Sequence, residues 1–464
     1  MSVLHTLETL IAPGKRSRLS PFVESAQFAV LFNEYPDENR RFESAGEILH
    51  RNDQRTRKIA QYWINFFQEG SNFRQNNYAE QDFLDAYLAY YFSTNVSKIQ
   101  LVLLDLVRDN RLQGQINLLD IGVGTGTTAV AVLDFLLIWG QVCDLYGQQF
   151  PITDVHLVGA DRSQGCRSQA ERVVKAYAES LQRRLESRQN AVTPTDEDVH
   201  ISNPDILRCV HTWASAATWH PLDLENQDAF GCGFEPNLVF LSNVLNELSS
   251  QGRENFERLL TGLPQGAISI VIEPGEKSHA TSLMKWRKDF CNRNLGFIAL
   301  APCGQEFGNE LPESCSNCWS FRRESFHQSA LYERFRKVCL EIISDKRKFD
   351  RFQNYLLSWS YAVFEKSSLH IYSKKITTSK LENIKIVNYL LTLRYIGSYR
   401  VKTKELEPVD YSPDKFNASG SEEPWQEYLK ICPEAVEPQN FILSENQASK
   451  LPHSATVSSS VCQT

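Results

Sequence analysis

Apolar side chains recur every three or four positions through most of the first 115 residues, which predicts a helical region. The pattern is strong over residues 57–68 and ends at Gly70. It resumes over residues 79–112, where the Ser-Thr-Asn run at 93–95 predicts a helix break and a cap. We expect these helices to form a cap beside the fold that follows; a substrate-selecting role for that cap stays open.

From residue 116 onward, short apolar runs alternate with longer helical patterns. The runs that predict strands begin at residue 116 and continue with 154–160, 209–214, 236–241, 267–272 and 298–300. The helical patterns between them include 127–140, 171–188 and 280–295. Strands that alternate with helices in this way predict an α/β fold with a doubly wound, mainly parallel, Rossmann-like sheet.

The first of these strands ends in a glycine-rich turn, LLDIGVGTGTTAV at 118–130. Asp120 lies near the strand end, Gly122, Gly124 and Gly126 form the turn, and a helical pattern begins directly afterwards. Such a strand, turn and helix start receive a nucleotide-like ligand in α/β sheets. The pattern D-x-G-x-G-x-G resembles motif I of the class I S-adenosylmethionine (SAM) methyltransferases. The resemblance implies that Asp120 and the three glycines bind SAM.

Other nucleotide ligands fit this turn less well. A dinucleotide fingerprint begun at Gly122 requires a glycine where the chain has Thr127. A looser fingerprint from Gly124 through Ala129 stays open. A phosphate-binding P-loop requires Gly-Lys-Ser/Thr, and the turn contains no lysine.

An acidic residue, Asp161, closes the second predicted strand. A carboxylate there can accept hydrogen bonds from both hydroxyls of a ribose. Asp161 lies about 35 residues after Gly126, more than the usual ~20, and residues 141–151 account for the excess as an insertion. The alternative role is a helix cap, which Ser163 could equally supply.

Two asparagines follow the fourth predicted strand, at the edge where methyltransferases bring the methyl acceptor to SAM. Asn243 and Asn246 are therefore candidate cleft residues, and Asn243 is also a candidate for cofactor binding. The alternative is that Asn246 only caps a helix or faces water. The catalytic residue stays unassigned, because the N/D-P-P-Y/F signature of amino-methylating enzymes is missing and no general base or nucleophile is evident.

The composition is typical of a soluble globular protein, with 42% apolar and 23% charged residues over a length of 464 that predicts two or three domains. The apolar run at 130–140 contains Asp134 and is too short to span a membrane. The N-terminus lacks an export-signal pattern. We therefore expect a cytoplasmic protein, with a mitochondrial location as the alternative, and neither a membrane nor DNA as a partner.

Charge is distributed unevenly along the chain. The formal net charge is −7, yet residues 319–404 carry 18 Lys/Arg against 7 Asp/Glu. Within 366–404 the basic residues are interleaved with tyrosines, and such side chains bind phosphates and stack on unpaired bases. This pattern predicts a basic, partly β, RNA-binding module; a solvated charged face with core tyrosines is the alternative. The RNA-binding candidates are Lys374, Lys375, Lys385, Arg394, Arg400 and Lys402.

Three cysteines, Cys303, Cys315 and Cys318, form the pattern C-x11-C-x2-C. Thiolates at such spacing bind a tetrahedral zinc ion or an iron–sulfur cluster, and either group needs a fourth ligand. Cys432, followed by proline, is the first choice for it. Plain structural burial is the alternative to metal binding. The other candidates for the fourth ligand are Cys291 and Cys339.

Several stretches together resemble the methyltransferase-like assembly factors of the small ribosomal subunit, best known from mitochondria. They are LLDIGVGTGT at 118–127, LVFLSNVLNEL at 238–248, IVIEPGEKS at 270–278, and ALAPC at 299–303 with the later CW-S-F-R-R. The resemblance implies that Cys303, Cys315, Cys318 and Cys432 hold an iron–sulfur cluster, [4Fe-4S], and that residues 355–363 form a helix. The chain has Gly304 and Gln305 where that family commonly has Pro-His, which keeps zinc as the alternative.

The patterns divide the chain into five predicted segments. These are a helical region (1–115), a SAM-methyltransferase-like domain (116–300), a cysteine-cluster segment (301–340), a basic module (341–445) and a disordered tail (446–464). The first hypothesis for function is a SAM-dependent methyltransferase acting on small-subunit ribosomal RNA. The second is a catalytically silent, RNA-binding ribosome-assembly factor. The third is an iron–sulfur or zinc sensor that gates RNA binding.

Overall fold

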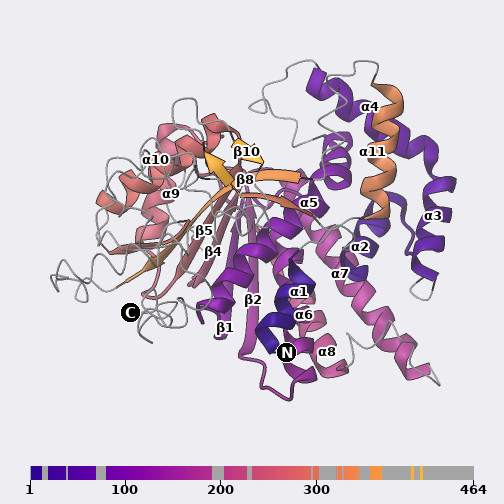
Figure 1. The fold of residues 1–464 in the computed structure, drawn as a ribbon, viewed down its shortest axis with the longest axis horizontal. Helices are drawn as coiled ribbons and strands as arrows, with labels where there is room; N and C mark the ends of the chain where they lie inside the picture. The colour runs from indigo at the N-terminus through magenta and orange to yellow at the C-terminus, as the bar shows by residue number, and fades with distance from the viewer. Residues whose placement is uncertain are drawn as a thin grey trace. The chain divides into compact units, whose positions relative to one another are not determined.

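The computed structural model describes most of the chain up to residue 367 and two short strands beyond it. The described residues are 2–12, 19–37, 40–68, 80–190, 203–226, 233–293, 296–302, 320, 322–326, 329–343, 356–367, 399–401 and 408–410. The chain, whose ribbon is drawn in Figure 1, forms two compact units. Unit 1 comprises Met1–Pro236 with Ser325–Leu356, and unit 2 comprises Asn237–Glu324 with Leu357–Thr464.

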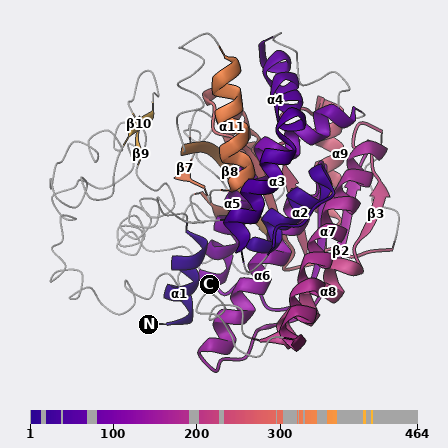
Figure 2. The same ribbon diagram turned by 90° about the vertical axis from the view of Figure 1, so that its right-hand side faces the viewer.

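Unit 1 contains a group of N-terminal helices, and one helix from much later in the sequence packs among them. They are α1 (Val3–Ile11), α2 (Pro21–Phe32), α3 (Arg41–Arg51), α4 (Asp53–Gln68), α5 (Gln81–Arg108) and the later α11 (Ala330–Ile342). α11 packs against α3, α4 and α5, as Figure 2 shows. The helices predicted at 57–68 and 79–112 are present as α4 and α5.

The helix break predicted at 93–95 is wrong, because α5 runs from Gln81 to Arg108 without interruption. The polar side chains at 93–95 are buried, and one of them bonds back to the helix, since Thr94 Oγ1 donates to the Tyr91 carbonyl at 2.8 Å. α5 also packs against α4 and α6 (Thr127–Leu145). Tertiary packing therefore outweighs the local capping signal.

A buried carboxylate ties α11 to the N-terminal helices. Glu24 of α2 is 2% exposed, and its carboxylate accepts hydrogen bonds from Arg41 Nε at 2.8 Å and from the Ala330 N–H at 2.6 Å. Ser329 caps α11 by accepting the Tyr332 N–H at 3.0 Å. The start of α11 is thus held by its own cap and by a hydrogen bond to a residue about 300 positions away.

Three parallel strands of unit 1 lie in the order β3-β2-β1. They are β1 (Gly114–Ile121), β2 (Ile152–Asp161) and β3 (Thr218–Pro221), connected through α6, α7 (Gln164–Asn190) and α8 (Pro204–Ser215). α7 packs on β2 and β3, and α8 packs on β2. Asp120 of β1 lies opposite Gly159 of β2, so the carboxyl ends of these two strands share one edge.

The strand predicted at 209–214 is wrong, because this segment belongs to helix α8. Asn203 caps the helix by accepting the Asp205 N–H at 2.8 Å, and Pro204 occupies the first helical position. The buried residues of α8 recur at helical rather than alternating spacing; they are Leu207, Val210, Trp213 and Ala214. The third strand follows as β3.

α6 is the core helix of unit 1. Its length and apolar composition would suffice to cross a membrane, but most of its residues are buried within the fold. Its buried acid, Asp134, accepts hydrogen bonds from Ser20 Oγ at 2.5 Å and from Gln100 Nε2 at 2.9 Å. Protein side chains thus satisfy a carboxylate that lies inside an apolar helix.

In unit 2, an antiparallel strand lies between two others. The unit contains β4 (Leu238–Ser242), α9 (Ser250–Thr261), β5 (Ile268–Pro274), α10 (Lys277–Arg293), β6 (Phe297–Ala301), β7 (Arg322–Ser325) and β8 (Leu356–Lys366). β4 and β5 are parallel, whereas β8 runs antiparallel to both β5 and β6 between them. β7 also pairs with β8, outside the main strand order of the sheet.

The helix implied by the family resemblance at 355–363 is wrong over residues 356–363, which form most of β8. Residues on both faces of the strand are buried, including Trp359, Ser360 and Tyr361. A strand buried on both faces shows no apolar–polar alternation, so its short apolar run could not be told from a helix.

Parallel strands with helices between them confirm the predicted doubly wound, mainly parallel α/β class. Of the predicted C-terminal module, the structure describes β9 (Tyr399–Val401) and β10 (Pro408–Asp410), which pair antiparallel with Val401 opposite Pro408. The rest of that predicted module beyond residue 367 lies outside the described residues.

Candidate cofactor-binding and acceptor sites

The turn after β1 requires its glycines. Gly122, Gly124 and Gly126 have φ angles of 72°, 51° and 76°, a left-handed backbone region that other residues seldom adopt. The Gly122 N–H donates to the Ala160 carbonyl at 2.8 Å, which fixes the turn to the end of β2. A Cβ on Gly126 would lie 3.0 Å from Ala170 Cα, so glycine also permits the close approach of α7.

Asp161 faces this turn from the end of β2. Its carboxylate accepts the Gly124 N–H at 3.2 Å and the Ser163 N–H at 2.8 Å. Burial raises the pKa of Asp161, whereas these two N–H donors and the nearby Arg162 and Arg167 lower it. Each carboxylate oxygen keeps a free lone pair for a further donor.

Ser163, rather than Asp161, caps the helix that follows β2. Ser163 Oγ accepts the Cys166 N–H at 3.3 Å, and the Ser163 carbonyl accepts the Arg167 N–H at 3.2 Å. Ser163 is thus the capping residue at the start of α7. Asp161 instead joins the glycine turn to the end of β2.

Asp120 is a buried carboxylate without a hydrogen-bond partner in the described part of the chain. It is 1% exposed, and both of its carboxylate oxygens are unsatisfied. The pKa of Asp120 is raised to about 7, because burial raises it strongly, the Thr128 hydroxyl lowers it, and the charge of Asp161 raises it. An unsatisfied buried carboxylate is costly, so a ligand that brings a hydrogen-bond donor or a positive charge would stabilise it.

The two predicted acceptor-site asparagines lie in unit 2, directly after β4. Asn243 has a left-handed backbone with φ 56°, and its N–H donates to the Ile272 carbonyl at 2.7 Å. Asn246 Nδ2 donates to Glu273 Oε2 at 2.7 Å. The Leu245 N–H donates to Glu273 Oε1, also at 2.7 Å.

Glu273 was not assigned a role from the sequence. It is 1% exposed, and burial raises its pKa to about 7 while the donors from Leu245 and Asn246 lower it. The sequence does carry one signal: a single acid ends the otherwise apolar run AISIVI. The partner on the neighbouring strand could not be read from that pattern.

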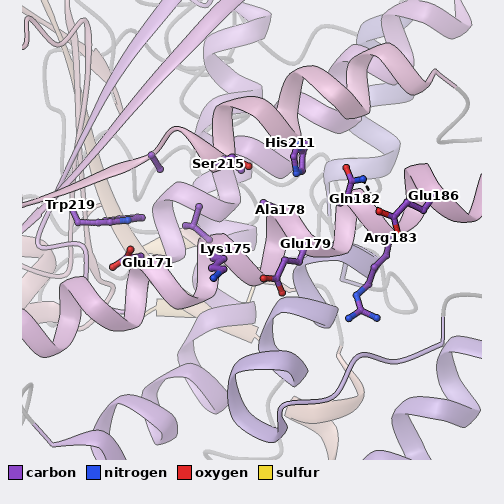
Figure 3. A pocket seen from close by; sticks show the side chains of 13 residues that line it. Glu171, Lys175, Ala178, Glu179, Gln182, Arg183, Glu186, His211, Ser215 and Trp219 are labelled. Carbon is purple, nitrogen blue, oxygen red and sulfur yellow. Dashed lines mark hydrogen bonds between the residues drawn. The ribbon is translucent and has the colours of Figure 1, made fainter.

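A separate groove of about 710 Å³ lies along α7 and α8 and reaches Trp219 of β3 (Figure 3). Its charged side chains alternate in sign along α7: Glu171, Lys175, Glu179, Arg183 and Glu186. Three acids against two bases give no net attraction for phosphate. None of the predicted site residues lines this groove.

The predicted metal ligands and most RNA-binding candidates lie outside the described residues. These are Cys303, Cys315, Cys318 and Cys432, with Lys374, Lys375, Lys385, Arg394 and Lys402; only the backbone of Arg400 is described, in β9. Over the described ranges, no group of three or more His, Cys, Asp or Glu side chains could hold a metal ion. Cys291 and Cys339, the other fourth-ligand candidates, lie in helices α10 and α11 and are 2% and 0% exposed.

The chain matches no protein-family model and no curated protein. Among solved structures it resembles the glycopeptide N-methyltransferase MtfA in complex with SAM (16% identity over 38% of this chain and 53% of that chain, TM-score 0.21). It also resembles the rRNA methyltransferase aviRa from Streptomyces viridochromogenes (15%, 39% and 75%, TM-score 0.24). A third is an O-methyltransferase family protein from Burkholderia thailandensis (12%, 67% and 72%, TM-score 0.31).

The match spans about half the length of the first of these proteins. Similarity at this level of identity and superposition says nothing about what this chain binds.

Proposed function

We propose that this chain binds SAM at the glycine turn of unit 1 and acts on, or binds, small-subunit ribosomal RNA in ribosome assembly or translation. The observation that carries the SAM assignment is the pairing of two carboxylates with one glycine turn. Asp161 is hydrogen-bonded to the Gly124 N–H, and the buried Asp120 keeps two unsatisfied oxygens. This arrangement favours a ligand with a ribose and a positively charged part.

The charge of the ligand favours SAM over a dinucleotide at this turn. A pyrophosphate would bring negative charge toward Asp120, and like charges in a buried site repel strongly. A sulfonium and an ammonium group would instead complement the carboxylates. The strand order of unit 2 agrees, because β8 runs antiparallel between β5 and β6, whereas the usual dinucleotide-binding sheet places the sixth strand directly beside the fifth.

Different residues of this chain would bind different parts of SAM. The Asp161 carboxylate would accept ribose hydroxyls, Asp120 would accept a donor from the amino-acid part, and the turn backbone would approach closely because it carries no side chains. Bound SAM would supply a methyl group on a sulfonium. The chain would contribute mainly by orienting the acceptor, with Asn243 and Asn246 as the candidate residues.

A catalytically silent RNA-binding assembly factor, stabilised by an iron–sulfur cluster or by zinc, is the second candidate. Glu273, one ionisable side chain beside the two asparagines, is 1% exposed, and its carboxylate already accepts hydrogen bonds from the Leu245 N–H and from Asn246 Nδ2, so it is engaged in holding the structure. That observation favours binding without transfer. Cys303, Cys315, Cys318 and Cys432 remain the proposed metal ligands.

The two candidates are separated by assaying labelled methyl transfer from SAM to purified small-subunit RNA, alongside SAM binding by calorimetry. Incorporated label supports the enzyme. SAM binding without incorporation supports the silent factor. An absence of SAM binding contradicts both the site and the enzyme.

A further inference from the structure

Trp219 of β3 lies across the end of β2 because residue 159 is a glycine. Gly159 pairs with Trp219 in the register of these two parallel strands. A Cβ at 159 would lie 2.3 Å from both Cε3 and Cζ3 of the Trp219 ring, closer than real side chains approach. The indole therefore occupies the space that a side chain at 159 would fill.

The same space is bordered by the glycine turn of unit 1. Val123, between Gly122 and Gly124, is 4% exposed, and its Cγ2 lies 3.2 Å from the point where a Cβ at Gly159 would be. The ring and the valine side chain thus converge on one point beside Gly159. The Val123 N–H donates to the Ala160 carbonyl at 3.2 Å, so the backbone of the turn is bonded to β2 one residue further along.

The start of α7 packs against the same turn. A Cβ at Gly126 would lie 3.0 Å from Ala170 Cα, and the next residue of α7, Glu171, lines the groove along α7 and α8. Figure 3 shows the Trp219 ring at one end of that groove, near Glu171. Trp219 is half-buried. Its ring thus lies against the strand end and also borders the groove.

The turn needs support of this kind. Gly122 and Gly124 have φ angles of 72° and 51°, which glycine adopts readily but does not enforce. The conformation must therefore be imposed by packing from outside the turn. A tryptophan ring is large and rigid and so suits this role. A turn that is ordered before the ligand arrives loses less conformational entropy on binding.

We infer that Trp219 is a positioning residue for the proposed SAM site: its ring holds Val123, and with it the glycine turn, in the conformation that receives the ligand. The inference rests on the proposed function. It assigns to a residue of β3 a part in SAM affinity that acts through packing on the turn.

The first test compares full-length wild type with Trp219→Ala, Trp219→Phe and the control Trp213→Ala. Trp213 is a tryptophan of α8 that is 6% exposed and does not line the groove. We expect amide hydrogen exchange at 122–124 to speed up about tenfold or more in W219A. It should stay within about threefold of wild type in W219F, which keeps an aromatic ring, and in W213A.

The second test measures SAM binding to the same proteins by calorimetry. We expect the Kd to weaken about tenfold or more in W219A and to stay within about threefold of wild type in W219F and W213A. Because W213A removes the same ring from the core of α8, it controls for a general loss of stability.

Gly159→Ala tests the position of the ring without removing it. Gly159 lies in regular strand backbone, so alanine there adds a steric clash with the ring and no backbone strain. We expect G159A to speed up exchange at 122–124 and to weaken the Kd for SAM in the same direction as W219A. A cavity left by a deleted side chain cannot account for such a result.

Each outcome decides a different claim. Wild-type exchange at 122–124 in W219A overturns the support of the turn, whether or not SAM binds. Wild-type SAM affinity in both W219A and G159A overturns the positioning role, and so does an equal loss of affinity in W213A. A wild type that binds no SAM contradicts the proposed function, whereas faster exchange in W219A would then still support the role of the ring in holding the turn.

Discussion

Asp120 and Asp161 lie at the ends of neighbouring parallel strands, yet their surroundings differ. Asp161 is partly exposed and accepts two backbone N–H groups, whereas Asp120 is 1% exposed and accepts none among the described residues. Chains do not usually leave a buried carboxylate unsatisfied, because its desolvation is costly. At the residue scale, Asp120 is therefore the clearest sign that the glycine turn receives a ligand.

Asp120 should make the stability of the free protein depend on pH. Burial raises its pKa from 3.8 to about 7, so between these values the folded protein holds a proton that the unfolded chain has lost. The free energy of unfolding should therefore fall as pH rises through this window. Between pH 5 and pH 8, we expect this fall to be smaller in Asp120→Asn by about 2–3 kcal/mol. Urea unfolding at both pH values measures it, and an equal fall in both proteins would contradict the assignment.

Gly126 and Gly114 offer a matched pair of substitutions. Both have positive φ, 76° and 69°, but a Cβ at 126 would lie 3.0 Å from Ala170 Cα while a Cβ at 114 would meet nothing within 4 Å. We expect Gly126→Ala to lower the free energy of unfolding by about 1–3 kcal/mol more than Gly114→Ala. Denaturant titration gives the difference, and equal losses would show that close helix packing is unimportant at Gly126.

At the scale of elements, the sequence pattern correctly located most strands and helices. It misassigned two elements, α8 and β8. β1, β2, β4, β5 and β6 were found, because short apolar runs bounded by turns specify strands. α8 was taken for a strand although Asn203 and Pro204 mark a helix start. β8 is buried on both faces and so gave no alternation.

In the candidate site too, local features could be predicted from the sequence and long-range contacts could not. Gly122, Gly124, Gly126 and Asp161 could be predicted because a turn and a strand end are local features. The contact between Asn246 and Glu273 could not, since it depends on the register of β4 against β5. Long-range pairing of this kind leaves no trace in local periodicity.

α11 should depend on Glu24 for its attachment. Glu24→Ala would leave Arg41 (17% exposed) without its buried partner and the Ala330 N–H without an acceptor. We expect a loss of about 2–4 kcal/mol in the free energy of unfolding and faster hydrogen exchange across α11. The control is Arg40→Ala, whose ion pairs with Glu43 and Glu47 are exposed, and which should cost no more than about 1 kcal/mol. A similar loss in both variants would contradict this role.

At the scale of the whole molecule, the proposed SAM site lies in a different part of the chain from the cysteine pattern and the basic stretch. The SAM-type residues belong to a described fold, whereas the cysteine pattern and the basic stretch at 366–404 are arguments from sequence. Together these sequence patterns predict, as a hypothesis still to be tested, a SAM-binding domain joined to RNA contacts and a metal site. The cysteine part of that implication can be tested without any substrate.

Protein purified without oxygen should be brown and contain iron and sulfide. We expect Cys303→Ser and Cys318→Ser to remove the colour, because thiolates are the ligands of such clusters. Cys209→Ser is the control, since Cys209 is an exposed free cysteine on α8. Metal analysis and absorption spectra decide the outcome: a colourless wild type with one zinc ion would replace the iron–sulfur cluster with zinc, and no metal at all would contradict the site.

SAM binding to the purified full-length chain, measured by calorimetry, tests the central claim most directly. We expect saturable binding of one SAM per chain and none of NAD, with Asp161→Ala weakening the Kd about tenfold or more. Asp154→Asn, a partly exposed acid near the start of the same strand, should leave binding unchanged. Binding of NAD, absence of SAM binding, or full SAM affinity in Asp161→Ala would contradict the account.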